Sequence, residues 1–273
     1  MKNRYTETIC NALEQNKAAL KKQFQESISE CGVRFCFLDG LLPEESALEI
    51  YHAFPAADRM RFMNSTKEQK YTSKDFDGFN LILKEITFAI QSPEVIRIIE
   101  EITGIPDQEA DETLYAGGLS LMSQGNFLNP HIDNSHDMSR QRYRTLNLLY
   151  YTTPHWKVEN GGNLELWDRS VKNNVVIHSR FNRLVLMETN PWSWHSVSKV
   201  SAEGQRTCVS NYYFSRYSPI GKDYFNVTSF QGRPDETFRR LFLPVENRLR
   251  NLIRKVKKEG FGKKDVYRGG KAP

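Results

Sequence analysis

Residues 143–151 read YRTLNLLYY, an apolar and aromatic run without glycine or proline. Such a run is typical of a buried β-strand. From about residue 115 the chain continues in this way, with short apolar runs separated by turns that contain glycine and asparagine. Short strands at this spacing predict a sandwich or a jelly roll. The predicted strands are Leu119–Ser123, Tyr143–Tyr151, Asn163–Trp167, Asn174–His178, Arg183–Met187, His195–Val200 and Arg206–Ser215.

Helices flank this β-rich region on both sides. Apolar residues at helical spacing predict helices over 5–29, 43–51, 80–89 and 93–103, with a strand over Val33–Leu38 between the first two. Residues 56–78 are charged and weakly patterned, so we expect a loop with some helix there. Near the C-terminus, a long amphipathic helix is predicted over 235–259, with a kink near Pro244. Its inner face would carry Leu241, Val245, Leu249, Leu252 and Val256.

The fold class is therefore mainly β with flanking helices. We expect a helix-rich part over 1–114, packed on a β core over 115–218, and then a C-terminal helix and basic tail over 219–273. The chain has 273 residues, which is enough to bury a substantial core, and these parts are expected to form one structural domain.

Composition excludes several classes of protein. Hydrophobic residues make up 39% and charged residues 26% of the chain, which is ordinary for a globular protein. No apolar run is long enough to span a membrane, and the N-terminal residues lack the apolar core of a signal peptide. The four cysteines are scattered, so we expect reduced thiols in a cytoplasmic protein, without a disulfide framework, a zinc site or a membrane partner.

The net charge of +5 is concentrated near the C-terminus. Residues 247–273 hold ten Lys/Arg and two acidic residues, and the rest of the chain is slightly acidic. Such a tail could attract nucleic acid or another anionic partner. A solvated helix face with a frayed end explains it more simply, because no aromatic residues interleave the basic ones.

A pair of polar residues just after a predicted strand is the main functional motif. His131 and Asp133 are two residues apart on an extended segment, so their side chains point to the same side. His195 follows 62 residues later on another predicted strand. Two imidazoles and one carboxylate can occupy one face of an Fe(II) octahedron and leave three positions open for dioxygen and a chelating cosubstrate. By itself the His-X-Asp pair also fits a polar turn.

An arginine close to the second histidine strengthens the iron interpretation. Arg206 begins the last predicted strand, eleven residues after His195. The cosubstrate 2-oxoglutarate chelates iron through its 2-oxo acid end and needs a cation for its far carboxylate. The planar guanidinium of arginine binds a carboxylate in a bidentate manner.

The segment 115–216 resembles the prolyl-4-hydroxylase-like branch of the Fe(II)/2-oxoglutarate-dependent oxygenases. The resemblance rests on the order and spacing of five stretches. They are 144–151 followed by Trp156, then 161–166, 182–186, 194–197, and 204–206 before 212–214. It implies a double-stranded β-helix (jelly roll) core that binds Fe(II), uses 2-oxoglutarate as cosubstrate and reacts with O2.

The resemblance also implies roles for single residues. His131, Asp133 and His195 match the iron ligands, and Arg206 matches the residue that binds the distal carboxylate of the cosubstrate. Tyr151 is similar to a family tyrosine that reaches the same carboxylate, or it is a core aromatic. Asn147 is four residues earlier on the same face of the predicted strand, so we expect it to line the site. The chain departs from the family at Met122, where many members have a tyrosine, and the aspartate at position 133 argues against halogenation.

The function that follows is hydroxylation of an unactivated carbon in a small molecule or a peptidyl residue, with release of succinate and CO2. Trp194, Tyr212 and Met122 are candidates for the substrate side of the site. The alternatives are desaturation, cyclisation or demethylation at the same metal centre, or a non-catalytic jelly-roll binding protein. Nucleic acid is the less favoured partner, and the sequence does not define the substrate or the oligomeric state.

Overall fold

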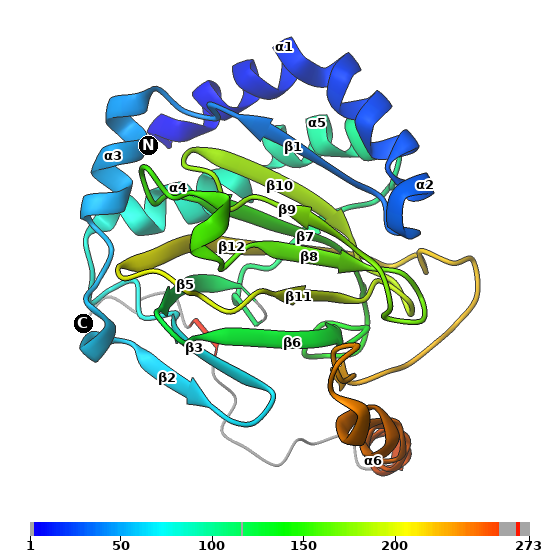
Figure 1. Cartoon of the computed structure of the whole chain (residues 1–273). Coiled ribbons are helices and arrows are strands. Elements are labelled where there is room, and N and C mark those ends of the chain that lie inside the picture. The colour runs from blue at the N-terminus through cyan, green and yellow to red at the C-terminus, as the bar shows by residue number, and fades with distance from the viewer. Residues whose placement is uncertain (1–2, 116, 257–265, 268–273) are drawn as a thin grey trace.

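The computed structural model describes residues 3–115, 117–256 and 266–267. Helices form most of the first third of the chain, and one further helix follows the last long strand (Figure 1). No helix in these ranges is long and apolar enough to cross a membrane. The α-helices are α1 (Arg4–Glu26), α2 (Ile28–Cys31), α3 (Glu44–His52), α4 (Leu81–Ile90), α5 (Pro93–Thr103) and α6 (Thr237–Val256).

In the described part of the chain, thirteen strands form one curved antiparallel sheet, which confirms the predicted mainly β fold with a jelly-roll core. Ten of them follow the order β1-β10-β7-β12-β5-β3-β6-β11-β8-β9. The strands are β1 (Phe35–Asp39), β2 (Arg61–Asn64), β3 (Glu68–Ser73), β4 (Glu109–Ala110), β5 (Gly118–Ser123), β6 (Phe127–Ile132), β7 (Tyr143–Tyr151), β8 (Leu164–Trp167), β9 (Asn174–Ile177), β10 (Arg183–Glu188), β11 (His195–Val197), β12 (Gln205–Ser215) and β13 (Ser229–Phe230).

Strand β7 shows how the two faces of this sheet are used. Leu146, Leu148 and Tyr150 belong to the large core that the N-terminal helices share with the sheet. Tyr151 points the other way, into a second apolar cluster between the two halves of the curved sheet. Because both faces are covered, the second half of the strand, Leu148–Tyr151, is an unbroken apolar run that does not alternate with polar residues. The helices cover the outer face, which leaves polar side chains such as Asn147 on the inner face.

A β-bulge in β7 changes the direction of one side chain. Tyr213 of β12 pairs with Leu146, but the next residue, Phe214, pairs with Arg144, so that Thr145 is the extra residue. The bulge places Arg144 on the same face as Tyr212 and Phe214. A regular strand would have turned Arg144 toward the helices.

Two predictions about secondary structure are wrong. Residues 56–78, expected as loop with some helix, contain the hairpin β2–β3, and β3 joins β5 to β6. The side chains of β3 are all half-buried, so the segment lacks the apolar alternation by which strands are recognised. The backbone pairing with β5 and β6, which is not visible in the sequence, holds it in place.

The predicted inner face of the C-terminal helix is also wrong. Leu241, Val245, Leu249 and Leu252 of α6 are 58–67% exposed, whereas Leu243 is buried. The helix is attached by polar side chains on the opposite face, so its apolar face points outward. The predicted residues 257–259 of this helix and most of the basic tail lie outside the described residues.

Candidate metal centre

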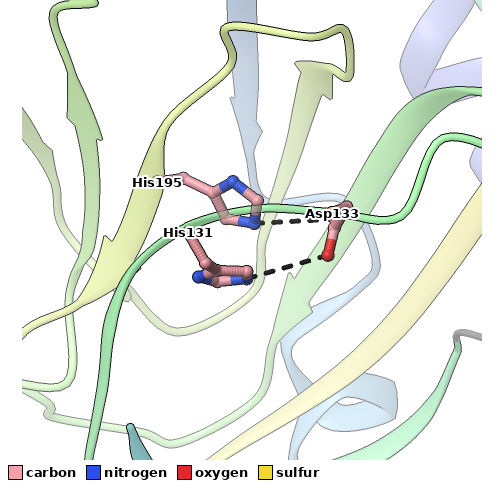
Figure 2. A group of neighbouring side chains, drawn as sticks. All are labelled: His131, Asp133 and His195. Atoms are coloured by element: carbon pink, nitrogen blue, oxygen red, sulfur yellow. Dashed lines mark ion pairs between the residues drawn. The ribbon is translucent and has the colours of Figure 1, made fainter. Parts of the chain in front are cut away.

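Two antiparallel strands bring the two histidines together. His131 of β6 pairs directly with His195 of β11, and their ring centroids are 4.1 Å apart. Asp133 follows the end of β6 and, as the two-residue spacing predicts, its side chain lies on the same side as that of His131 (Figure 2). Pairing across the sheet therefore assembles the cluster from segments that are distant in sequence.

The ligand atoms converge on one point. Asp133 Oδ1 lies 3.7 Å from His131 Nε2, and Asp133 Oδ2 lies 3.6 Å from His195 Nε2 (Figure 2). One potential ligand atom from each residue lies within 4.8 Å of the others, and no second cluster of this kind occurs among the described residues. Metal–nitrogen bonds of about 2.1 Å at right angles separate neighbouring ligands by roughly 3 Å, so a small movement would close this triangle on an ion.

The hydrogen bonds of the histidines leave the correct nitrogens available. His131 Nδ1 lies 3.0 Å from Asn129 O, and His195 Nδ1 lies 3.0 Å from Ser193 O. A carbonyl can only accept, so each Nδ1 carries the proton and each Nε2 keeps its lone pair. Burial, and then the nearby His195, lower the pKa of His131 to about 3. His131 is therefore neutral at pH 7, as a metal ligand must be.

Asp133 is held by an arginine that the sequence analysis did not select. Arg144 Nη1 lies 3.2 Å from Asp133 Oδ1, and its Nη2 donates to Asn134 Oδ1 at 2.6 Å. Burial opposes the ionisation of Asp133, but the Arg144 guanidinium and the other basic groups nearby together outweigh it and hold the pKa of the carboxyl below its usual range. Asp133 Oδ2 is buried without a hydrogen-bond partner. A buried carboxylate oxygen without a partner is costly, so the site fits a cation at this position.

A second polar region lies on the inner face of β12 and β7. Arg206 is 3% exposed, and its guanidinium lies 5.0 Å from the centre of the Tyr151 ring. Its Nε donates to Gly162 O at 3.0 Å, and no acceptor among the described residues bonds its two terminal nitrogens. The Tyr151 hydroxyl is also buried without a partner, and burial raises its pKa above the usual range, so it keeps its proton. These donors can bind a carboxylate.

The glycine pair 161–162 positions Arg206. Gly161 has a φ of 73°, and a Cβ there would lie 2.0 Å from Lys199 O. The backbone can pass this close to its neighbour only without a side chain. That close approach is what brings Gly162 O to the Arg206 guanidinium.

The other residues that were predicted to line the site, which are Asn147, Tyr212, Trp194 and Met122, differ from one another in burial and in their neighbours. Asn147 is 2% exposed with its Oδ1 unpartnered, and it pairs across the sheet with Tyr212. The Arg144 guanidinium lies 4.3 Å from the centre of the Tyr212 ring, which places Tyr212 beside Asp133. Trp194 is partly exposed and directly precedes His195. Met122 is buried in an apolar cluster that includes Phe230, and it lies opposite Arg206 on the neighbouring strand.

Phe230 of β13 is a second residue that sequence reasoning missed. It pairs with His131, and its ring stacks on the imidazole with centroids 5.4 Å apart. Strand β13 has two residues, too few for any periodicity. Arg144 did carry a signal, since it is a charged residue at the start of an otherwise apolar predicted strand.

Comparison with known proteins finds a family match over most of the β-rich region. Residues 117–214 match the family model described as the 2OG-Fe(II) oxygenase superfamily. Solved structures with a similar fold include a prolyl-4-hydroxylase from Pseudomonas putida (15% identity, TM-score 0.52, covering 72% of this chain and 98% of that one). A prolyl 4-hydroxylase from Phytophthora capsici is 16% identical with a TM-score of 0.55, and the match covers 94% of this chain and 81% of that one. The non-heme alpha-ketoglutarate-dependent epimerase SnoN from nogalamycin biosynthesis is 14% identical with a TM-score of 0.52, and the match covers 75% of this chain and 87% of that one. No curated protein matches the chain.

Residues 117–214 thus match the 2OG-Fe(II) oxygenase superfamily, and prolyl-4-hydroxylase-like proteins are among the structural neighbours of the chain. Members of this superfamily are dioxygenases that use Fe(II), 2-oxoglutarate and O2. The matched range contains the histidine–aspartate cluster and Arg206. At these low identities the structural similarity shows only that the fold is shared. The substrates of the neighbouring structures are properties of those proteins alone.

The low pKa of His131 predicts how the stability of the metal-free protein depends on pH. The unfolded chain protonates this histidine near its ordinary pKa of 6.5, but the folded chain does so only near 3. Between these values the unfolded state binds more protons, so acidification favours unfolding. We expect the free energy of unfolding to fall as the pH drops from 7 to 5, and to fall less in His131→Gln. Urea denaturation at both pH values measures this, and an equal fall in both proteins would contradict it.

Proposed function

We propose that this protein is an Fe(II)- and 2-oxoglutarate-dependent hydroxylase that acts on an unactivated carbon of a small molecule or a peptidyl residue. His131, Asp133 and His195 hold the iron. The observation that carries the proposal is the convergence of two lone-pair nitrogens with a buried carboxylate oxygen that has no partner. The reaction consumes one O2 and one 2-oxoglutarate and yields the hydroxylated product, succinate and CO2.

The iron and 2-oxoglutarate, when bound, supply the activation of O2 that no amino-acid side chain provides. The protein contributes orientation and a shielded pocket. Asn129 and Ser193 fix the ring orientation of the histidines through their backbone carbonyls, and Arg144 fixes one oxygen of Asp133. The burial of both imidazoles keeps water from the cluster.

Arg206 and Tyr151 bind the distal carboxylate of 2-oxoglutarate in this proposal. The Arg206 side chain is buried without a carboxylate partner among the described residues, and Tyr151 offers a protonated hydroxyl beside it. A charge-assisted bidentate contact would satisfy both groups. Asn147 and Tyr212 lie on the same inner face and border the pocket. Met122 lies opposite Arg206 on β5, and Trp194 directly precedes His195, so both stay candidates for the border of the pocket.

A different oxidation at the same centre is the alternative outcome, and the fold is compatible with it, since one structural neighbour is described as an epimerase. Product mass decides between the outcomes. Incubation with Fe(II), 2-oxoglutarate, O2 and a panel of peptides and metabolites should yield succinate together with a product heavier by one oxygen atom. Loss of two hydrogen atoms, or an unchanged mass with inverted stereochemistry, would reject hydroxylation. Failure to form succinate under any condition would reject the enzyme proposal.

Arg144 should affect the metal through Asp133. Arg144→Met removes the ion pair to Oδ1 and leaves the carboxylate free to turn. Loss of a group that orients a metal ligand costs about 10- to 100-fold in metal affinity or activity, so we expect weaker Fe(II) binding by at least about tenfold. Anaerobic equilibrium dialysis measures it. Arg144→Lys should recover little, because lysine cannot contact Asp133 and Asn134 together. Unchanged Fe(II) affinity in the methionine variant would contradict this role.

A further inference from the structure

Helix α6 presents its apolar residues to the outside of the protein. In Figure 1 the helix lies beyond the edge of the sheet, next to β6. Seven large apolar side chains on it are 42–80% exposed, whereas a helix that packs on a core buries such residues. They are Phe238, Leu241, Phe242, Val245, Leu249, Leu252 and Ile253. Contiguous exposed apolar surface of this kind marks an interaction site.

Polar side chains on the opposite face fix this orientation. Asn247 Nδ2 donates to Phe230 O at 2.7 Å, and its Oδ1 accepts from Phe230 N at 3.1 Å. Asn251 Oδ1 accepts from Val227 N at 2.9 Å, and Leu243, one turn before Asn247, is buried. At 3.6 residues per turn, these positions lie opposite Val245 and Leu249. The bonds to the body therefore direct the apolar face away from it.

Basic residues border the apolar face on both sides. Residues 237–256 contain six Lys/Arg and one acidic residue, Glu246. The helical repeat places Arg239 and Arg250, with Glu246 between them, along one border and Arg248 along the other. Arg239 pairs with Glu236 and Arg250 with Glu246, so the excess of positive charge is greater on the Arg248 side. Arg248 is exposed, and Arg239 and Arg250 are partly exposed. An apolar stripe between two cationic borders has the pattern of a helix that lies in the plane of a membrane surface.

We propose that α6 binds the surface of an anionic lipid bilayer, with its apolar face at the boundary between headgroups and acyl chains. The 20 residues form a stripe roughly 30 Å long, and the cationic borders would meet lipid phosphates. A second copy of the chain is a poorer occupant, because two such faces together would oppose their cationic borders. The proposal departs from the expectation of no membrane partner and does not depend on the proposed reaction.

Vesicle sedimentation with the full chain tests the proposal. We expect the protein to sediment with phosphatidylcholine vesicles that contain phosphatidylglycerol, and much less with pure phosphatidylcholine. Leu249→Asp should abolish sedimentation, and Arg248→Glu should reduce it by at least about fivefold. Both side chains are exposed, so the fold should persist, and circular dichroism checks this. Leu81→Asp is the matched control, since Leu81 is 62% exposed on α4, and it should bind like the wild type.

Three results would overturn the proposal. The first is the absence of sedimentation with anionic vesicles at low salt. The second is equal sedimentation of the wild type and Leu249→Asp, combined with loss on removal of residues 257–273, which would assign the binding to the basic tail. The third is a dimer in sedimentation velocity that Leu249→Asp dissociates while vesicles have no effect, which would assign the apolar face to a second copy.

Discussion

Replacement of His131 by alanine should lower the rate of succinate formation by more than about a hundredfold. Loss of a group that merely orients a metal ligand already costs about 10- to 100-fold, and loss of the ligand itself should cost more. His131 contributes one of two Nε2 atoms to the cluster, and no other histidine belongs to it. Succinate released from 2-oxoglutarate with Fe(II) and O2 measures the effect directly.

The matched control for this variant is His52→Ala. His52 is an exposed histidine in the last turn of α3, far from the cluster in the fold. This variant should retain the wild-type rate, and both variants should keep the far-ultraviolet circular dichroism of the wild type. If His131→Ala released succinate as quickly as His52→Ala, the assignment of His131 as an iron ligand would be wrong.

Replacement of Arg206 by methionine should raise the KM for 2-oxoglutarate by roughly a hundredfold. The variant loses a bidentate contact between buried charges and leaves the distal carboxylate of the cosubstrate unpaired. We expect a smaller change in kcat, because Arg206 binds the end of the cosubstrate that does not react. Tyr151→Phe loses a single hydrogen bond and should raise the KM about fivefold.

Arg97→Met provides the comparison, since Arg97 is exposed on α5 and belongs to no part of the site. Initial rates over a range of 2-oxoglutarate concentrations separate KM from kcat. A wild-type KM in Arg206→Met would show that the distal carboxylate binds elsewhere. Arg206→Lys should fall between the two, because lysine keeps the charge but offers no planar fork.

Local residue patterns were enough to predict most strands of the core, although β6, which carries His131, was not among the predicted strands. The predicted strand Tyr143–Tyr151 has the bounds of β7. The predicted strand Arg206–Ser215 begins one residue after the first residue of β12 and ends at the same residue. These strands are buried on both faces, and their apolar and aromatic stretches make them easy to recognise. The spacing of His131 and Asp133 also carried real geometric information, because two residues apart on an extended chain means the same side.

Other features depend on contacts that the sequence does not reveal. Arg144 reaches Asp133 only because a bulge at Thr145 turns it to the inner face, and a bulge has no local sequence signal here. The outward direction of Leu249 depends on the bonds from Asn247 and Asn251 to β13 and the segment before it. Periodicity identified the apolar face of α6 but could not tell whether the protein or something else covers it.

Anaerobic binding of Fe(II) tests the central claim most directly, since it needs no knowledge of the substrate. After equilibrium dialysis and metal analysis, the wild-type protein should hold one Fe(II) per chain. The double variant His131→Ala, His195→Ala should hold none above the level of a blank, although its circular dichroism is unchanged. Retention of one Fe(II) per chain by the double variant, or none by the wild type, would contradict the assignment of this cluster as the iron site.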